Sequence, residues 1–335
     1  MIWLKTNIPG IFICFAAALA SAWLGKELPL IGGPVFGIII GIIINNTLRM
    51  PAWFPQGIKF TSKRILQLAI IFLGAGLSLF QVWETGLESL PVMLFTLLLA
   101  FVSAFICGKI MKVPYKLTWL IGTGTAICGG SAIAAVSPII EAEESDIAYS
   151  ISVIFLFNII AVLVFPPLGH LLGFSEKAFG LWAGTAINDT SSVVAAGYAF
   201  STAAGDYATI VKLARTTMII PISLIFATVM SVKRKKHTSE GGSVNYSLTK
   251  IFPWFILGFL AASLMNTLNI ISANTASYLS ELGKFLIVMA LTAVGLSADI
   301  KKMLKSGVKP LLLGLITWLT VAFASIAIQF ITGKI

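Results

Sequence analysis

The sequence predicts an all-α, polytopic membrane protein, and three observations lead to that class. Of the 335 residues, 58% are hydrophobic and 11% are charged, whereas charged residues make up about 25% of an average soluble domain. Apolar stretches of about 20 residues, the length that crosses a bilayer as a helix, recur along the whole chain. No polar stretch is long enough for a separate soluble domain, so residues 1–335 are expected to form one integral membrane domain.

Taken in chain order, the apolar stretches predict eleven spans. Their expected ranges are residues 8–25, 30–48, 64–80, 90–110, 117–140, 147–169, 178–200, 207–231, 250–269, 281–299 and 309–332. The acidic stretch with Glu84 and Glu88 is expected to be the loop before the fourth span, and Glu141 to Asp146 the loop after the fifth. The longest polar stretch, from Lys233 to Tyr246, is basic and is expected to join two halves of the protein.

The positions of lysine and arginine predict which loops face the cytoplasm. Most of the 23 basic residues, Lys177 among them, share one side if the N-terminus is cytoplasmic, and cytoplasmic loops carry an excess of such residues. We therefore expect a cytoplasmic N-terminus, an external C-terminus and an external loop from Glu141 to Asp146. Because the net charge of +10 is spread over short loops beside spans, it does not indicate a nucleic-acid partner. The three cysteines and two histidines show no spacing typical of a disulfide or a metal site.

One sequence motif occurs twice, each time deep within an apolar stretch. The first copy runs from Gly122 to Ala135 (GTGTAICGGSAIAA) and the second from Ala183 to Ala196 (AGTAINDTSSVVAA). Glycine and hydroxyl residues at such depth predict broken helices near the bilayer midplane, where transporters bind their substrates. The alternative is close helix packing through small residues.

Three ionisable residues are expected inside the membrane near these motifs. Asp189 lies near the middle of the seventh span, and a charge at that depth costs about 2.5–3.5 kcal/mol on insertion scales. It is therefore a candidate for carrying a proton or Na⁺. Lys212 and Arg215 lie on one face of the eighth span at similar depth, and two cations on a buried face favour an anion. The structural alternatives are an ion pair between Asp189 and Arg215 and a snorkelling Lys212.

The first motif predicts a second way to hold an anion. If the helix breaks near Gly129 and Gly130, a half-helix begins at about Ser131 with free backbone N–H groups, and serine is a favoured N-cap residue. The predicted substrate-binding residues are Thr125, Gly129, Gly130, Ser131, Thr185, Lys212 and Arg215. The predicted ion-coupling residues are Asn188, Asp189, Thr190 and Ser191. Asn158, alone in the sixth span, is expected to make an interhelical hydrogen bond.

A second internal echo links segments of opposite orientation. The tripeptide from Gly76 to Ser78 recurs from Gly295 to Ser297, and Pro91 recurs as Pro310 at the same offset. Segments of opposite direction that resemble each other are typical of an inverted repeat. The motif echo, however, joins the fifth and seventh spans, which run in the same direction if both cross the membrane. One inverted repeat therefore does not explain both echoes.

The residues of these echoes also resemble a known family. The two GTAI motifs, the stretch from Lys212 to Arg215 (KLAR) and the later GLS tripeptide resemble the YeiH family of bacterial inner-membrane proteins. The resemblance covers the second to the eleventh span and implies a multi-pass exporter of sulfate or a similar anion. More distantly, the chain is similar to bile-acid symporters and cation/proton antiporters. That similarity implies an extra helix at residues 1–29, inverted repeats at 30–173 and 174–335, and broken crossing helices at the fifth and tenth spans. Transporters of these folds often form homodimers.

The function predicted by these features is secondary active transport, in the export direction, of a small anion such as sulfate, a sulfonate or a carboxylate. H⁺ or Na⁺ is the expected coupling ion, and no cofactor or catalytic residue is expected. One alternative is a cation/proton antiporter without an organic substrate. A channel would need a continuous polar path, and an integral-membrane enzyme would have the acidic stretch from Glu141 to Asp146 as its nearest candidate site. The chain contains no nucleotide-binding motif, which argues against an ATP-driven pump.

Overall fold

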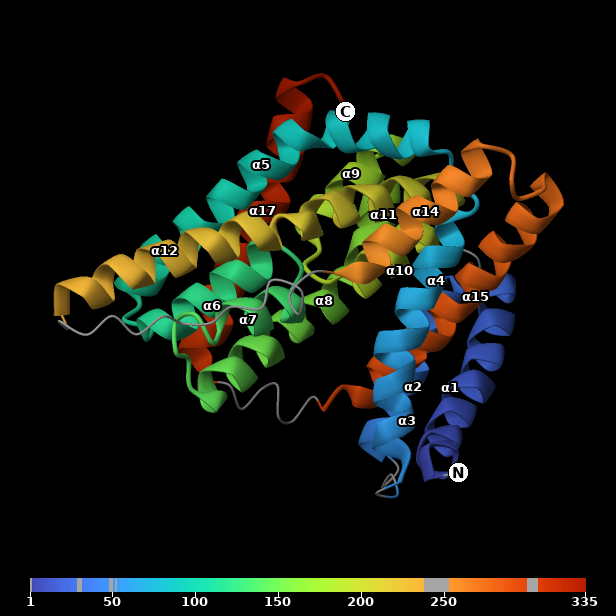
Figure 1. The fold of residues 1–335 in the computed structure, drawn as a ribbon, viewed down its shortest axis with the longest axis horizontal. Helices are drawn as coiled ribbons and strands as arrows, with labels where there is room; N and C mark the ends of the chain where they lie inside the picture. Colours follow the sequence, from blue (N-terminus) through green and yellow to red (C-terminus); the bar gives the residue numbers. More distant parts are fainter. Residues whose placement is uncertain (1, 29–31, 48–50, 52, 238–252, 300–306) are drawn as a thin grey trace.

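The computed structural model describes residues 2–28, 32–47, 51, 53–237, 253–299 and 307–335, which form helices and no strands (Figure 1). The helices are α1 (Ile2–Glu27), α2 (Gly33–Thr47), α3 (Phe54–Phe60), the π-helical turn η1 (Thr61–Ile65), α4 (Leu66–Gly74), α5 (Leu79–Ile110), α6 (Tyr115–Ala126), α7 (Gly130–Val136), α8 (Glu144–Leu171), α9 (Glu176–Ala186), α10 (Thr190–Phe200), α11 (Thr202–Thr217), α12 (Ile219–His237), α14 (Trp254–Thr267), α15 (Ala273–Ser297) and α17 (Val308–Ile331).

The expected all-α membrane fold is confirmed. Six described segments are long and apolar enough to cross a membrane, namely Thr6–Glu27, Leu79–Ile110, Glu144–Leu171, Thr202–Ser231, Ala273–Ser297 and Val308–Ile331. The helices α2 and α14 are shorter but also apolar. Of the polar stretch expected to join two halves, residues 233–237 extend α12 and the rest lies outside the described residues.

Most helix boundaries agree with the predicted spans, but the start of α5 does not. The stretch with Glu84 and Glu88, expected to be a loop, is the beginning of this 32-residue helix. The reason is a capping box: the Ser78 side chain accepts from the Gln81 backbone N–H while the Gln81 side chain accepts from the Ser78 N–H. This pairing satisfies helix-end donors and starts the helix at Leu79, before the apolar run begins.

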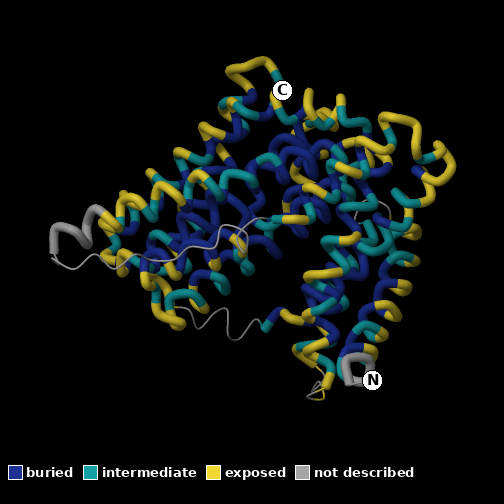
Figure 2. The backbone as a smooth tube through the Cα atoms, viewed as in Figure 1, coloured by how far each residue is buried: buried dark blue, intermediate teal, exposed yellow. Residues whose placement is uncertain are grey.

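The helices form two groups that lie side by side (Figure 1). One group contains α1 to α4, α14 and α15, and the other contains α5 to α12 and α17. In the first group α15 packs against α2 and α4, and in the second α17 packs against α5, α6 and α9. The groups meet where α10 packs against α2 and α15. Figure 2 shows buried backbone concentrated inside both groups.

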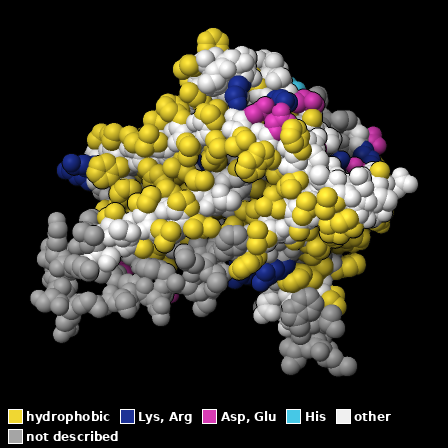
Figure 3. All heavy atoms as spheres, turned by 45° about the horizontal axis from the view of Figure 1, so that its top comes forward, with side chains coloured by type: hydrophobic (Ala, Val, Ile, Leu, Met, Phe, Trp, Pro, Cys, Tyr) yellow, Lys and Arg dark blue, Asp and Glu magenta, His cyan; other side chains and the backbone are white. Residues whose placement is uncertain are grey.

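The outer surface is largely apolar, as a membrane-facing surface is. Figure 3 shows hydrophobic side chains over most of one face, with the charged side chains gathered toward its edges. Large apolar side chains such as Phe80, Phe323 and Ile110 are about 70% exposed. Since soluble monomers rarely expose large contiguous apolar patches, this surface is suited to lipid.

The predicted seventh span is a helical hairpin, not a crossing helix. The rings of Phe179, near the start of α9, and Phe200, at the end of α10, stack with centroids 4.0 Å apart. A Cβ added to Gly180 or to Gly197 would meet the same carbonyl oxygen, that of Ala204, at 3.0 and 3.3 Å. The start of α9 and the end of α10 therefore lie at one level, and the chain returns to the side from which it entered. We call α9 and α10 the second hairpin, with residues 187–189 as its tip.

The predicted fifth span is also a hairpin. Lys116, at the start of α6, donates from Nζ to the carbonyl of Glu141, beyond the end of α7, at 2.6 Å. Near the turn, a Cβ on Gly124 would lie 2.9 Å from Cδ1 of Ile133, so the two limbs pack against each other. We call α6 and α7 the first hairpin, with residues 127–129 as its tip.

The two hairpins enter from opposite ends of α8. This helix has 28 residues and is about 42 Å long, enough to cross a bilayer. The base of the first hairpin lies at its beginning, because Glu141 precedes α8 by only a few residues. The base of the second lies at its end, where the ring of His170 stacks on Phe200 with centroids 4.1 Å apart.

This geometry corrects two sequence-based expectations. Limbs of 11 or 12 residues reach about 17 Å, roughly half of a 30 Å hydrocarbon core, so the fifth and seventh predicted spans are re-entrant. Without these two crossings, the loop from Glu141 to Asp146 and the loop that contains Lys177 exchange the sides predicted for them, and the other predicted loops keep theirs. The tenth predicted span was expected to be broken as well, yet α15 is continuous from Ala273 to Ser297.

Single-cysteine labelling tests the re-entrant topology. In a variant lacking Cys14, Cys107 and Cys128, we expect Lys109→Cys and Glu143→Cys to react with a membrane-impermeant maleimide from one side. Lys177→Cys should react only from the other side, because α8 separates the two hairpin bases. Eleven crossing helices would instead put Lys109→Cys with Lys177→Cys and set Glu143→Cys apart, and that result would refute the hairpins.

Candidate functional site

The tips of the two hairpins meet inside the second group of helices. Gly129 in the first tip has φ of +68° and ψ of −127°, as in the first central position of a type II′ turn, which glycine favours. A Cβ at Gly129 would lie 3.6 Å from Cβ of Asp189 in the second tip. The two copies of the sequence motif therefore come together at one point, from opposite ends of α8.

Two fully buried cations on α11 hold the first limb of each hairpin. Lys212 donates from Nζ to the carbonyls of Ile127 at 2.8 Å and Ile187 at 3.0 Å, and so bridges the tips. Arg215 donates from Nε to Ala126 at 2.6 Å, from Nη2 to Thr125 at 2.9 Å, and from Nη1 to Thr185. These carbonyls end α6 and α9, where a helix carries partial negative charge and four unsatisfied acceptors. Both side chains have 0% exposure.

These contacts change the roles expected for the cations. The Arg215 guanidinium donates to three carbonyls, and the described residues Arg215 and Asp189 do not form the ion pair that was considered for them. Instead, Asp189 accepts from the backbone N–H of Ser191 at 3.1 Å and from the Ser191 hydroxyl, which makes it the N-cap of α10. The carbonyls at the helix ends thus accept hydrogen bonds from both cations, but they carry no formal charge that would neutralise them.

The second limbs of the hairpins begin differently from each other. In the second tip, Oδ1 of Asn158 accepts from the N–H groups of Asn188 at 3.1 Å and Asp189 at 3.3 Å. Asn158 thus bonds to the backbone of the tip between α9 and α10 and not, as expected, to another helix. In the first tip α7 starts at Gly130, one residue before the predicted start, and its N-cap Gly129 offers no side-chain cap. Ser131 is consequently not the N-cap that the sequence suggested, because the turn requires glycine there. It lies in the first turn of α7 and is exposed.

The remaining predicted site residues lie around the same point. The hydroxyls of Thr125 and Thr185 are buried and donate to carbonyls one turn back, those of Ile121 and Leu181. Thr190 and Ser191 are buried in the first turn of α10. Gly130 is half-buried, and a Cβ there would meet no atom within 4 Å, so this side of the tip is open.

Several buried polar atoms at the tips have no partner among the described residues. These are both amide atoms of Asn188, Nδ2 of Asn158 and the hydroxyl of Thr123. Since buried polar groups are nearly always hydrogen-bonded, such a cluster has the capacity to bind water, an ion or a small polar molecule. Thr123 is not among the site residues predicted from the sequence. The link between Asn158 and the tip was not predicted either, because an isolated amide in a span gives no indication of its partner.

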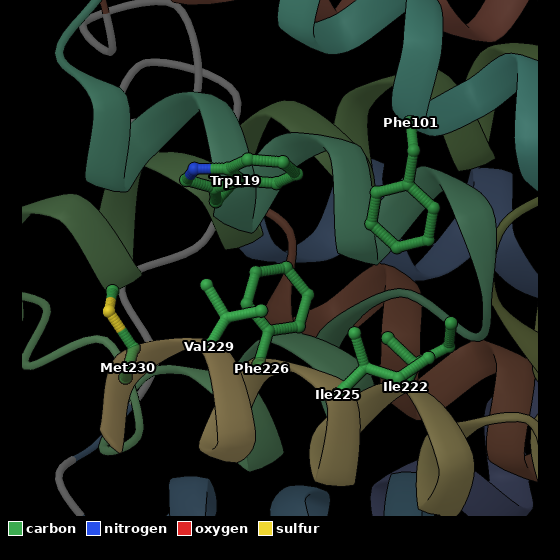
Figure 4. Close-up of a pocket in the computed structure, with 7 residues that line it drawn as sticks. All are labelled: Phe101, Trp119, Ile222, Ile225, Phe226, Val229 and Met230. Carbon is green, nitrogen blue, oxygen red and sulfur yellow. The ribbon is translucent and has the colours of Figure 1, made fainter. Parts of the chain in front are cut away.

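A separate apolar pocket lies outside this centre. It has a volume of about 190 Å³ and is lined by Phe101, Trp119, Ile222, Ile225, Phe226, Val229 and Met230 from α5, α6 and α12 (Figure 4). No charged side chain lines it, so it offers nothing that would hold a small ion. Its surface fits the acyl chains of the surrounding bilayer.

Two glycines at the first tip form a matched pair for a stability test. Gly129→Ala puts a side chain at positive φ and 3.3 Å from Cγ2 of Ile154, and should destabilise the protein by about 1–2 kcal/mol. Gly130→Ala meets nothing and removes a flexible residue from a helix, so it should be neutral or stabilise by about 0.4–1 kcal/mol. Thermal unfolding of the detergent-purified variants would show the difference. Equal effects of the two substitutions would contradict the turn described here.

The carbonyl contacts of Arg215 predict a large loss of stability in Arg215→Met. Three buried carbonyls would lose their donor, at about 1–3 kcal/mol each. Lys284→Met provides the control, because its partner Glu281 is 69% exposed and surface ion pairs contribute about 0–1 kcal/mol. A stability of Arg215→Met within that control range would show that the carbonyls do not depend on Arg215.

Comparison with known proteins identifies the family. A family model described as conserved hypothetical protein 698 matches residues 9–314. Proteins named UPF0324 membrane protein are 46% identical in Fusobacterium nucleatum, over 98% of this chain and 99% of that protein, and 44% identical in Clostridium tetani, over 100% of both. A sodium proton antiporter structure, MjNhaP1 from Methanocaldococcus jannaschii at pH 8, covers 96% of each chain at 13% identity and a TM-score of 0.31, which is too weak a likeness to inform the fold. The chain belongs to the family of conserved hypothetical protein 698, the YeiH-type family of UPF0324 membrane proteins.

Proposed function

We propose that this membrane protein is a secondary active transporter of a small anion, with the substrate bound where the hairpin tips meet. The observation that carries the proposal is the charge at the tips: Lys212 and Arg215 are both buried against them, and Asp189 is the one acidic residue in either tip. A residual positive charge inside a membrane protein attracts an anion strongly, since the low local dielectric screens it little.

The open side of the first tip suits such a substrate. Gly130 has free space beside it and Ser131 is exposed, so a hydroxyl and backbone N–H groups are accessible there. Sulfate, a sulfonate or a carboxylate presents acceptor oxygens to donors of this kind. The family resemblance adds export from a bacterial inner membrane as the expected direction, and a homodimer as the expected assembly.

Entry from opposite ends of α8 supports alternating access. If one hairpin loosens, the point where the tips meet opens to the side from which that hairpin enters. If the other hairpin loosens, the same point opens to the opposite side. In neither case does a tip have to move far. We propose that residues 30–173 and residues 174–335 form two inverted repeats. The boundary between them falls between α8 and α9 and gives each repeat one hairpin.

Paired helix contacts in the other group of helices support the same division. A Cβ on Gly74 in α4 would meet the carbonyl of Phe259 in α14 at 2.5 Å. A Cβ on Gly295 in α15 would meet the carbonyl of Ile38 in α2 at 2.4 Å. Each half thus uses a glycine near the end of one helix to admit the backbone of a helix from the other half.

Asp189 favours H⁺ or Na⁺ as the coupling ion, and it also supports the alternative of a cation/proton antiporter without an organic substrate. Its carboxylate is partly exposed, and the unpartnered Asn188 amide adjoins it. An enzyme is a weaker alternative, because the acidic stretch from Glu141 to Asp146 lies at the base of the first hairpin and away from the tips.

Transport assays in proteoliposomes test the anion-transporter proposal and the alternative of a cation/proton antiporter. We expect sulfate or an organic anion to accumulate under a proton or sodium gradient, and Asp189→Asn to reduce gradient-driven accumulation about tenfold or more, the effect of ~1.4 kcal/mol. Asparagine retains the N-cap of α10, so folding should be preserved. Asn266→Asp, at the end of α14, controls for altered charge elsewhere. Full coupled transport by Asp189→Asn would exclude its coupling role, and cation exchange without anion flux would favour the antiporter.

A further inference from the structure

A polar pocket at the base of the second hairpin has no place in the transport proposal. It has a volume of about 200 Å³ and lies between α5, α9, α11 and the end of the chain. Its lining residues are Glu88, Lys177, Ala178, Leu181, Tyr207, Gln329 and Lys334. One water occupies about 30 Å³ in the liquid, so the pocket has room for about six non-hydrogen atoms.

One lining residue, Gln329, has 0% exposure, and its amide oxygen has no hydrogen-bond partner among the residues that the structure describes. The hydrogen bonds around it determine which amide atom is free. Thr185 donates its hydroxyl hydrogen to the carbonyl of Leu181 at 2.6 Å, so Ser325 must donate to Thr185 across their 2.7 Å contact. Ser325 therefore accepts from Gln329, whose Nε2 lies at 3.3 Å. The unused atom is Oε1, an acceptor, and a buried acceptor is costly unless a donor reaches it.

The rest of the pocket wall carries charges of both signs. Lys334 donates from Nζ to the backbone carbonyl of Glu88 at 2.5 Å, and Tyr207 donates its hydroxyl to Oε2 of Glu88 at 3.1 Å. The ammonium of Lys334 is thus held by the Glu88 backbone, and the Glu88 carboxylate is held by Tyr207. Lys177, from the first turn of α9, adds a second ammonium that is exposed. The pocket thus combines two cations with a carboxylate and a free amide oxygen.

We propose that this pocket binds a small zwitterion, such as an amino acid without a large side chain. Its ammonium group would donate to Oε1 of Gln329 and face Glu88, and its acid group would face Lys177 and Lys334. A simple anion would leave the Gln329 oxygen without a donor, and a simple amine would bring no acid group to Lys177 and Lys334. A molecule with both groups supplies the donor and the acid group together.

The pocket is also connected to the hairpin tips. Gln329, Ser325 and Thr185 form a buried chain of hydrogen bonds, and the carbonyl of Thr185 accepts from Arg215. A ligand that fixes Gln329 therefore orders α17 against α9 and, through Thr185, the first limb of the second hairpin. The site is distinct from the tips, and its existence does not depend on the transport proposal.

The test compares β-alanine, which has about six non-hydrogen atoms, with propionate and propylamine, which each lack one of its charged groups. A ligand that binds the folded state raises the apparent stability of the purified protein. β-Alanine should stabilise the full-length protein, and propionate and propylamine should stabilise it much less. Gln329→Leu should raise the dissociation constant of β-alanine about 10- to 100-fold. Lys177→Ala removes an exposed charge and should raise it by up to about fivefold. Lys59→Ala, an exposed lysine on α3, is the matched control.

The outcomes separate this site from the tips. Lys177 is exposed, so Lys177→Ala remains informative if Gln329→Leu does not fold. Stabilisation by β-alanine that persists in Asp189→Asn and is weakened in Lys177→Ala supports the pocket. Stabilisation that is lost in Asp189→Asn and unchanged in Lys177→Ala would place the ligand site at the tips, which would refute the pocket proposal and leave the transport proposal intact. No response to β-alanine, or an equal response to propionate, would also overturn it.

Discussion

The structure depends on one constraint: a chain that reverses inside a membrane must find donors for the carbonyls it exposes. The first limbs of the two hairpins end with carbonyls of Thr125, Ala126, Ile127, Thr185 and Ile187 that point at one place. Lys212 and Arg215, one turn apart on α11, satisfy all of them. Their charges also oppose the negative ends of α6 and α9. The burial of two cations is thus explained by the helix ends that they hold.

The same constraint accounts for the repeated motif. Both first limbs end in Gly-Thr-Ala-Ile, since both present equivalent carbonyls to α11 and pack closely against their neighbours. The motifs differ after that point, because the second limbs begin differently: glycine makes the first turn, whereas Asp189 and Asn158 satisfy the N–H groups of the second. Because the hairpins enter from opposite ends of α8, the two copies of the motif are inverted with respect to each other, as the segments of the second echo are expected to be.

The sequence was sufficient to predict the class, nearly every helix position, and the breaks in the two motifs. It was not sufficient for the hairpins, because a pair of short limbs and a single crossing helix have the same length and hydropathy. The charges of the loops did not reveal the hairpins, because two uncounted reversals leave every loop after the second hairpin on the side predicted for it. The polar chain through Ser325 and Gln329 was missed for another reason. Its residues come from α9 and α17, which are far apart in sequence, and each alone resembles an ordinary packing residue.

Lys212 gives the proposed transport cycle a physical basis. Its single ammonium group bridges Ile127 in one tip and Ile187 in the other, so a tip that withdraws leaves a buried carbonyl without its donor. Such a loss costs about 1–3 kcal/mol, which opposes movement of the empty protein. A substrate or coupling ion at the tips makes new contacts that offset this cost. Movement then occurs mainly when the site is loaded, and that is the condition that coupled transport requires.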